Sequence, residues 1–160
     1  GENTVKAVLI DTTGKPCGAA KVAEVQDYVD PASKGLTATI NGKDYVVGDG
    51  LGNGKANIGA HFTAVAANAL EITVSFTAEL TNEAVKDTVK QEAQKAMEEY
   101  IKNMVLKESE NMVVRVSAVG AILSKVKNLV DYTNLQLNGA IKNIIPKEDD
   151  VPVLKEVIME

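Results

Sequence analysis

The segment 70–80, LEITVSFTAEL, and the segment 82–106 that follows it decide the fold class. In the first segment apolar residues alternate with polar ones, and this period of two predicts a strand with one face in solvent. In the second, apolar residues recur at helical spacing over about six turns, which predicts a long amphipathic helix capped by Thr81 or Asn82. Its apolar stripe consists of Val85, Val89, Ala93, Met97, Ile101 and Met104. A strand followed by such a helix predicts an α+β unit.

The rest of this half of the chain continues with short elements. A short strand, a short helix and two further strands are predicted, in this order, at 113–116, 119–126, 130–137 and 151–158. Ser117 is suited to cap the short helix, and the turn pair Asn138-Gly139 ends the strand before it. Pro152 has no N–H to donate and favours an edge strand or the first residue of a strand.

The first half repeats the order of strand, helix and strand. The strand 5–10, VKAVLI, ends in the turn residues 11–14, and a helix is expected from Pro16 to the helix-stopping pair Asp30-Pro31. A second strand follows at 61–66. Between helix and strand lie seven of the twelve glycines, which predict a hairpin at 36–47 around Asn41-Gly42 and a tightly turning or flexible loop at 48–54.

Together these patterns predict the α+β class, with two small tandem units that resemble α/β sandwiches. Each unit is expected to have a mixed or antiparallel sheet with helices on one face. The first domain is expected at 1–68, with a glycine-rich insertion at 32–59. The second is expected at 69–160 and contains the helix 82–106.

Composition excludes several classes of protein. The 160 residues carry a net charge of -5, and 45% of them are hydrophobic, which is typical of a soluble domain and not of a disordered or collagen-like chain. No apolar run approaches the roughly 20 residues of a membrane-spanning helix. The acidic balance and the single arginine, Arg115, argue against nucleic acid as a partner. One cysteine and one histidine allow no internal disulfide and no histidine-rich zinc site.

The glycine loop 48–54 is a weak candidate for a ligand site. A phosphate-binding loop of the Walker A type would need glycine where Asp49 stands and Ser or Thr where Ala56 stands. A calcium loop is broken at Leu51. A turn or flexible tip is therefore the favoured interpretation, with a ligand cradle as the alternative.

His61 and Cys17 are the other candidates for chemistry. His61, at the start of a predicted strand, is interpreted as a structural or surface residue, although a hydrolase that uses it with Ser and Asp stays open. Cys17 lies near a helix start, where a thiol pKa can be lowered, but a partly buried small residue is favoured. No catalytic, cofactor-binding or metal-binding residue is assigned.

Charged residues have mainly structural interpretations. Acylphosphatase-like modules share the repeated strand-helix-strand order, but their phosphate-holding loop arginine is missing from 12–15. Arg115 is expected to form an ion pair or an interface contact. The mixed charges on the outer face of the helix 82–106 predict a solvated surface. The acidic patch 148–150 is expected to be a solubilising loop, with docking of a basic neighbour as the alternative.

The run 52–60 reads GNGKANIGA, and the segment 114–117 reads VRVS. These and further segments resemble the baseplate J-like protein family, whose GxAPIGA segment has a proline where this chain has Asn57. The segment 35–47 has the character of an inserted hairpin. The resembling segments are 4–11, 27–31 and 52–60 in the first half, and 114–117, 120–123, 130–135, 137–139, 143–144 and 151–154 in the second.

The resemblance implies a structural, non-enzymatic protein without cofactors. Members of the family are wedge components in the baseplates of contractile phage tails and phage-tail-like bacteriocins. The expected partners are other wedge and hub proteins, in a particle assembled in the bacterial host cytoplasm. Family members are typically longer, so this chain, which does not begin with Met, is expected to be a C-terminal portion and, when isolated, a monomer or weak dimer.

A second class of function stays open at this point. A small-ligand or carbohydrate-binding module could use the loop 48–54 together with the hairpin 36–47.

Overall fold

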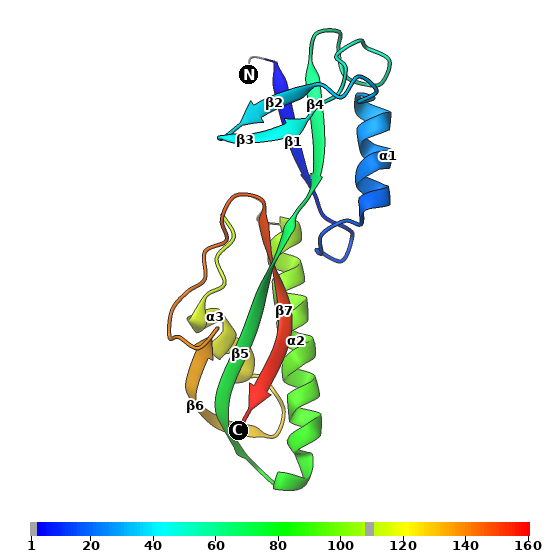
Figure 1. Cartoon of the computed structure of the whole chain (residues 1–160). Helices are drawn as coiled ribbons and strands as arrows, with labels where there is room; N and C mark the ends of the chain where they lie inside the picture. Colours follow the sequence, from blue (N-terminus) through cyan, green and yellow to red (C-terminus); the bar gives the residue numbers. More distant parts are fainter. Residues whose placement is uncertain (1–2, 108–110) are drawn as a thin grey trace. The chain divides into compact units, whose positions relative to one another are not determined.

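A computed structural model describes residues 3–107 and 111–160 and confirms the α+β class. The described residues form three α-helices and three small sheets, with about 28% helix and 37% strand (Figure 1). The chain divides into two compact units. Unit 1 contains residues 16–67 and the strand that leads to Asp11, and unit 2 contains residues 68–160 and the loop Thr12–Lys15. That each unit folds as an independent domain stays a prediction.

Unit 1 is built on two parallel strands joined through a helix. β1 (Thr4–Leu9) pairs with β4 (His61–Ala66) in a register that runs from Thr4 opposite His61 to Leu9 opposite Ala66. This sheet is parallel, contrary to the expected mixed or antiparallel pairing, because a helical crossover returns the chain in the same direction. The crossover helix α1 (Ala19–Val29) packs on β4.

The hairpin of unit 1 has the predicted turn. β2 (Thr37–Ile40) and β3 (Lys43–Val46) pair antiparallel. Asn41 and Gly42 connect them with φ angles of 51° and 79°. Two consecutive positive φ angles are typical of the type I′ turn, whose twist matches that of the flanking strands.

The first helix begins three residues later than expected. Pro16 forms an antiparallel bridge with Ile10, and the Cys17 N–H donates to the Leu9 carbonyl at 3.3 Å. These contacts hold the chain extended up to Gly18, the N-cap residue, so that α1 starts at Ala19. Proline is compatible both with the first turn of a helix and with an extended bridge. The local sequence pattern therefore predicted a start of α1 that is too early.

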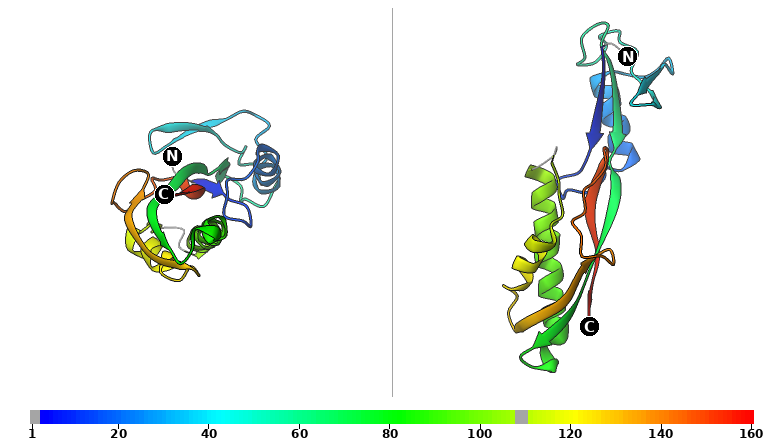
Figure 2. Two further views of the ribbon diagram at one scale, coloured as in Figure 1. Left: turned by 90° about the horizontal axis from the view of Figure 1, so that it is seen from below. Right: turned by 90° about the vertical axis from the view of Figure 1, so that its left-hand side faces the viewer.

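Unit 2 is a mixed three-stranded sheet with helices on one face (Figure 2). β5 (Asn68–Leu80) lies in the centre, antiparallel to β6 (Leu129–Leu137) and parallel to β7 (Asp150–Met159). β7 is an edge strand, as Pro152 predicted. A short 3-10 helix, η1 (Glu83–Val85), leads into α2 (Lys86–Lys107), and α3 (Val116–Leu123) follows. The Asn82 side chain accepts from the Ala84 N–H at 2.9 Å and caps η1.

The core of unit 2 lies between α2 and the sheet. Ile72, Val74 and Phe76, which alternate along β5, are at most 2% exposed. From α2, the predicted stripe is buried at Val89, Ala93, Met97, Ile101 and Met104. The alternation of β5 and the helical stripe from Val89 onward are therefore confirmed, because both sets of side chains are withdrawn from water. Val85, the first residue of the predicted stripe, lies in η1 and is half-buried.

The short strand predicted at 113–116 does not form. Only Val114 pairs, in an isolated antiparallel bridge with Ile144, through hydrogen bonds of 2.9 and 3.0 Å. Val116 is already the first residue of α3. An apolar β-branched run favours a strand locally, but a strand needs a partner along its whole length, and Ile144 supplies one residue only.

Ser117 does not cap α3, contrary to the prediction. The helix N-cap is Arg115, whose side chain makes no capping hydrogen bond. The cap comes from a distant residue: the Asn143 Oδ1 accepts from the Val116 N–H at 3.0 Å. Ser117 lies within the first turn of the helix, so its hydroxyl does not hold the N-cap position.

Within residues 3–107 and 111–160, no helix combines the length and the apolar character needed to cross a membrane.

Candidate functional site

The glycine-rich loop of unit 1 is organised by a buried carboxylate. Asp30 follows the last residue of α1 and is 2% exposed. Its Oδ1 accepts from the Gly50 N–H at 3.1 Å, and its Oδ2 accepts from the Phe62 N–H at 3.1 Å. Asp30 thereby ties the end of α1, the loop and the start of β4 together, and the sequence had marked it only as the end of a helix.

Gln26 extends this network along the outer edge of β4. Its side-chain amide donates to the carbonyls of Asp30 and Phe62 at 2.6 and 3.0 Å, and its Oε1 accepts from the Ala64 N–H at 2.8 Å. Backbone groups that another strand would otherwise pair are thus satisfied by a helix side chain. No local sequence pattern indicates this role, because it depends on how α1 lies against β4.

Two glycines of the loop are required by close approach. A Cβ on Gly48 would overlap the carboxyl group of Asp30, and a Cβ on Gly54 would overlap the Val29 carbonyl. The Val29 carbonyl in turn accepts from the N–H groups of Lys55 and Ala56, each at 2.8 Å. The backbone of this loop is therefore packed against the end of α1.

Asp49, the acidic residue of this loop, has its carboxylate turned inward. The residue is 7% exposed, the Ser33 hydroxyl donates to its Oδ2 at 2.5 Å, and the Lys34 N–H donates to its Oδ1 at 2.9 Å. The hydrogen bond from Ser33 is the main cause that lowers the pKa of Asp49 from its ordinary value of 3.8. Asp49 thus holds the chain after Pro31 against the loop.

His61 also braces the loop. Its Nδ1 lies 2.8 Å from the Gly48 carbonyl oxygen. Because a carbonyl only accepts, the Nδ1 carries the proton and donates it. Gly50 (φ 65°) leaves the space that the imidazole occupies, since a Cβ there would lie 2.8 Å from the His61 Cε1. This position is consistent with the structural role expected for His61.

The outer side of the loop presents large apolar side chains. We call Tyr28, Leu51, Lys55 and Ile58 the loop surface. Ile58 is 83% exposed, Tyr28 63% and Leu51 45%. The Lys55 Nζ lies 5.5 Å from the centre of the Tyr28 ring, within the range of a cation-π contact. A well-braced loop that holds apolar groups in solvent is typical of a protein-binding surface.

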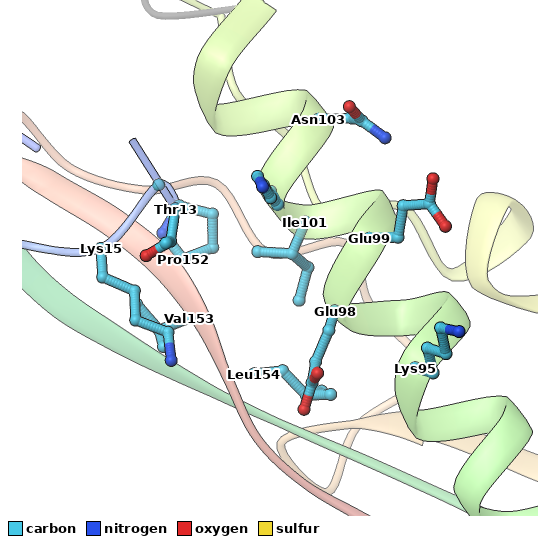
Figure 3. Close-up of a pocket in the computed structure, with 12 residues that line it drawn as sticks. Thr13, Lys15, Lys95, Glu98, Glu99, Ile101, Asn103, Pro152, Val153 and Leu154 are labelled. Carbon is cyan, nitrogen blue, oxygen red and sulfur yellow. The ribbon is translucent and has the colours of Figure 1, made fainter. Parts of the chain in front are cut away.

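Unit 2 has a groove of about 430 Å³ between the loop Thr12–Lys15, the second half of α2 and the start of β7. Its floor is apolar, with Ile101, Pro152 and Leu154 (Figure 3). Glu98 reaches toward Leu154, whereas Glu99 points away from β7.

The rim of this groove carries charges of both signs. The rim residues are Lys15, Lys95, Glu98, Glu99 and Lys102. Mixed charges of this kind do not single out a charged ligand. In the part of the chain that the structure describes, no three His, Cys, Asp or Glu side chains gather to hold a metal ion.

The segments of unit 2 that resemble the family have structural contacts. The Asn138 side chain accepts from the Thr73 N–H at 2.7 Å and donates to the Glu71 carbonyl at 3.0 Å, which fastens the end of β6 to β5. Tyr132 packs edge-on against Phe76, with ring centres 6.4 Å apart. A Cβ on Gly120 would lie 2.5 Å from the Tyr132 hydroxyl, so this glycine lets α3 approach β6.

The remaining candidates from the sequence are spread over both units. Cys17 is half-buried and precedes the N-cap of α1, and Arg115 is exposed at the start of α3. In the acidic patch, Asp150 begins β7 and accepts from the Asn68 side chain at 3.2 Å. Cys17 and His61 belong to unit 1, whereas Arg115 and Asp150 belong to unit 2.

Comparison with known proteins identifies the family. Residues 72–160 match the baseplate J-like protein C-terminal domain. The chain is 28% identical over 159 residues to the phage-like element PBSX protein XkdT of Bacillus subtilis (strain 168), and 27% identical over 159 residues to YqbT of the same organism, which is described as uncharacterized. Each alignment covers 98% of this chain and 40% of the relative. Since the family match extends over more than half of its residues, the chain belongs to the baseplate J-like family.

Proposed function

We propose that this chain is a structural part of the baseplate of a contractile tail, in a phage, a prophage or a phage-tail-like bacteriocin. The observation that carries the proposal is the match of residues 72–160 to the baseplate J-like C-terminal domain. The similarity to a protein of the phage-like element PBSX supports it. Because the chain spans 40% of the length of these relatives, the role of the whole protein in the wedge belongs to the proposal.

The chemistry of the glycine loop supports a non-enzymatic role. Asp30, Asp49 and His61 each hold backbone or hydroxyl groups of the protein itself. Groups that are engaged in this way stiffen the loop. A stiff loop loses little conformational entropy on binding, which favours assembly by complementary shape.

In this proposal the partners are other wedge and hub proteins, and neither nucleic acid nor a membrane takes part. The particle would be assembled in the cytoplasm of the bacterial host. The isolated chain is expected to be a monomer or weak dimer, because a subunit of this kind makes its contacts during assembly. Sedimentation velocity over a range of concentrations tests this expectation.

Electron microscopy of particles from a deletion strain tests the proposal. Without the gene, complete baseplates should be absent, and the full-length wild-type gene should restore them. A gene with the substitutions Leu51→Asp and Ile58→Asp should fail to restore assembly if the loop surface is an interface. A control gene with Val130→Asp, at a residue of unit 2 that is 59% exposed, should restore it. Normal baseplates in the deletion strain would contradict the structural role.

The small-ligand or carbohydrate-binding alternative finds no specific support. The carboxylates of Asp30 and Asp49 are turned inward, whereas the Asn53 side chain is exposed. A thermal-shift screen with sugars would revive this alternative if one of them stabilised the wild-type chain and not the variant Asn53→Ala.

A further inference from the structure

We propose that Asn53 is a site of spontaneous deamidation and that the fold directs this reaction to Asn53 and away from Asn138. The chain contains three Asn-Gly pairs, at 41-42, 53-54 and 138-139. In such a pair the glycine, which has no Cβ, lets its own nitrogen approach the side chain of the asparagine. The same dipeptide therefore stands in three structural settings, and the settings decide which one reacts.

The reaction needs no reagent other than water. The backbone nitrogen of Gly54 attacks the Asn53 Cγ and loses its proton, a C–N bond forms, and the side-chain nitrogen leaves as ammonia. The product is a five-membered succinimide. Water then opens one of the two ring carbonyls and yields either aspartate or isoaspartate, in which the main chain runs through the former side chain.

Asn53 is available for this step. Its side chain is exposed, and among the described residues neither that side chain nor the Gly54 N–H has a hydrogen-bond partner. The attacking nitrogen and the carbonyl carbon under attack therefore need not break a hydrogen bond before they meet.

Asn138 is held in place at both ends of its side-chain amide. The oxygen accepts from the Thr73 N–H at 2.7 Å, and the nitrogen donates to the Glu71 carbonyl at 3.0 Å. Its backbone N–H also donates to the Thr73 carbonyl at 2.9 Å. Both side-chain bonds must break before the Cγ can turn toward Gly139, which should slow the reaction by about tenfold or more.

Asn41 occupies a third setting and is not needed for the comparison. It lies in the two-residue turn between β2 and β3, where the pairing of the strands restrains the backbone. The Asn41 residue also makes at least one polar, ring or electrostatic interaction with another residue.

Deamidation at Asn53 would alter the loop surface. Isoaspartate adds one backbone atom immediately before Gly54, which is packed against the Val29 carbonyl. The new carboxylate would also stand two residues from Lys55, the residue that contacts the Tyr28 ring. The conformation of the loop surface would therefore change as the protein ages.

Mass spectrometry of the aged chain tests the proposal. The purified 160-residue chain is kept in warm, mildly alkaline buffer and digested with trypsin at intervals. Cleavage after lysine places Asn53 in the peptide 44–55 and Asn138 in the peptide 128–142, and fragment ions assign the change within each peptide. We expect the peptide 44–55 to gain one mass unit and an isoaspartate form at least about tenfold faster than Asn138 is converted.

The same chain in concentrated urea is the control, because it keeps both dipeptides and removes the fold. There the two rates should become similar. Equal rates in the folded chain would overturn the proposal, and so would a difference that persists unchanged in urea, since the order of reaction would then reflect local sequence. The variant Asn53→Gln should keep the peptide 44–55 at its original mass, and a continued gain of one mass unit in that peptide would also overturn the assignment.

Discussion

At the scale of single residues, Asp30 shows how one side chain can organise a loop that lies far from it in the sequence. It accepts from Gly50, 20 residues away, and from Phe62, 32 residues away. The pair Asp30-Pro31 did end the helix as the sequence predicted. The partners of the carboxylate could not be predicted, because they depend on the return of the chain through β4.

Removal of the Asp30 carboxylate should destabilise the protein strongly. In Asp30→Ala the buried N–H groups of Gly50 and Phe62 lose their acceptor, and we expect the free energy of unfolding of unit 1 to fall by about 2–4 kcal/mol. Urea denaturation followed by circular dichroism measures the change. Asp27→Ala removes an exposed carboxylate from the same helix and should change stability by less than about 0.5 kcal/mol. Similar effects of the two substitutions would contradict the assigned role.

The hydrogen bond between Ser33 and Asp49 should make the free energy of unfolding depend on pH in the acidic range. The Ser33 hydroxyl is the main cause of the lowered Asp49 pKa. A carboxyl group with a lower pKa in the folded state stabilises the fold fully above its unfolded value, near the ordinary 3.8, and loses this contribution as pH falls through the folded value. We expect Ser33→Ala to raise the Asp49 pKa, as measured by NMR titration of the side-chain carboxyl carbon.

The effect of Ser33→Ala on stability should follow the same sign. The difference in urea midpoint between Ser33→Ala and wild type should be larger near neutral pH than in acid, where Asp49 is protonated in both proteins. Ser117→Ala, at an exposed position in α3, is the control and should show no such pH dependence. A Ser33→Ala difference that is constant across this range would show that the hydrogen bond does not stabilise the charged form.

At the scale of elements, α3 and β6 depend on asparagines that act over long distances in the sequence. Asn143 caps α3, and Asn138 fastens the end of β6 to β5. Asn134, with a φ of 54°, lies where the pairing of β5 with β6 shifts by one residue. A residue with positive φ at such a shift is typical of a β-bulge, which increases the local twist of the strand. The sequence predicted both elements but neither the bulge nor the source of the cap.

Substitution of the distant cap should weaken α3. We expect Asn143→Ala to lower the free energy of unfolding by about 1 kcal/mol, because the Val116 N–H loses its acceptor. Ser117→Ala should cost less than about 0.5 kcal/mol, since Ser117 is not the cap. Urea denaturation of both variants measures the two values. A larger loss of stability in Ser117→Ala than in Asn143→Ala would contradict capping by Asn143 and support the capping by Ser117 that the sequence predicted.

The turn of the glycine loop offers a second test at this scale. Gly48→Ala should destabilise unit 1 by about 2 kcal/mol or more, because the new methyl group overlaps Asp30, a buried residue that cannot move without losing its hydrogen bonds. Gly18→Ala is a matched control, since a Cβ there has open space within 4 Å and the φ of Gly18 is -69°. Thermal unfolding monitored by circular dichroism measures the midpoints of both variants. A wild-type midpoint for Gly48→Ala would contradict the close approach of Gly48 to Asp30.

At the scale of the whole molecule, the two compact units divide the chain without following its order completely. The loop Thr12–Lys15 belongs to unit 2, although residues on both sides of it belong to unit 1. Gly14, which is buried with a φ of 80°, lies where a Cβ would be 3.5 Å from Val105 on α2. The sequence predicted a turn at 11–14 but not its place on α2.

Unit 2 should fold without unit 1. We expect a fragment of residues 68–160 to unfold cooperatively, because the core between β5 and α2 lies entirely within it. The fragment lacks Gly14 and its neighbours, so water should reach Val105 and lower the stability moderately. Amide NMR spectra and urea denaturation of the fragment test both points. A fragment without dispersed amide signals would contradict the prediction that unit 2 is an independent domain.

The sequence by itself determined the elements whose signal is local and periodic. The alternation in β5, the stripe of α2 and the Asn41-Gly42 turn were all predictable, because burial of one face and the φ requirements of a tight turn leave a direct trace in the order of residues. Family membership was also predictable, from resemblance in segments spread along the chain.

Only the tertiary structure decided the contacts between distant segments. Asp30 became an acceptor for the loop, Asn143 became the cap of α3, and the run 113–116 formed one bridge where a strand was predicted. The physical reason is the same in each case. A polar side chain or a β-branched run has several local uses of similar free energy, and the partner that selects one of them is brought near only when the chain folds.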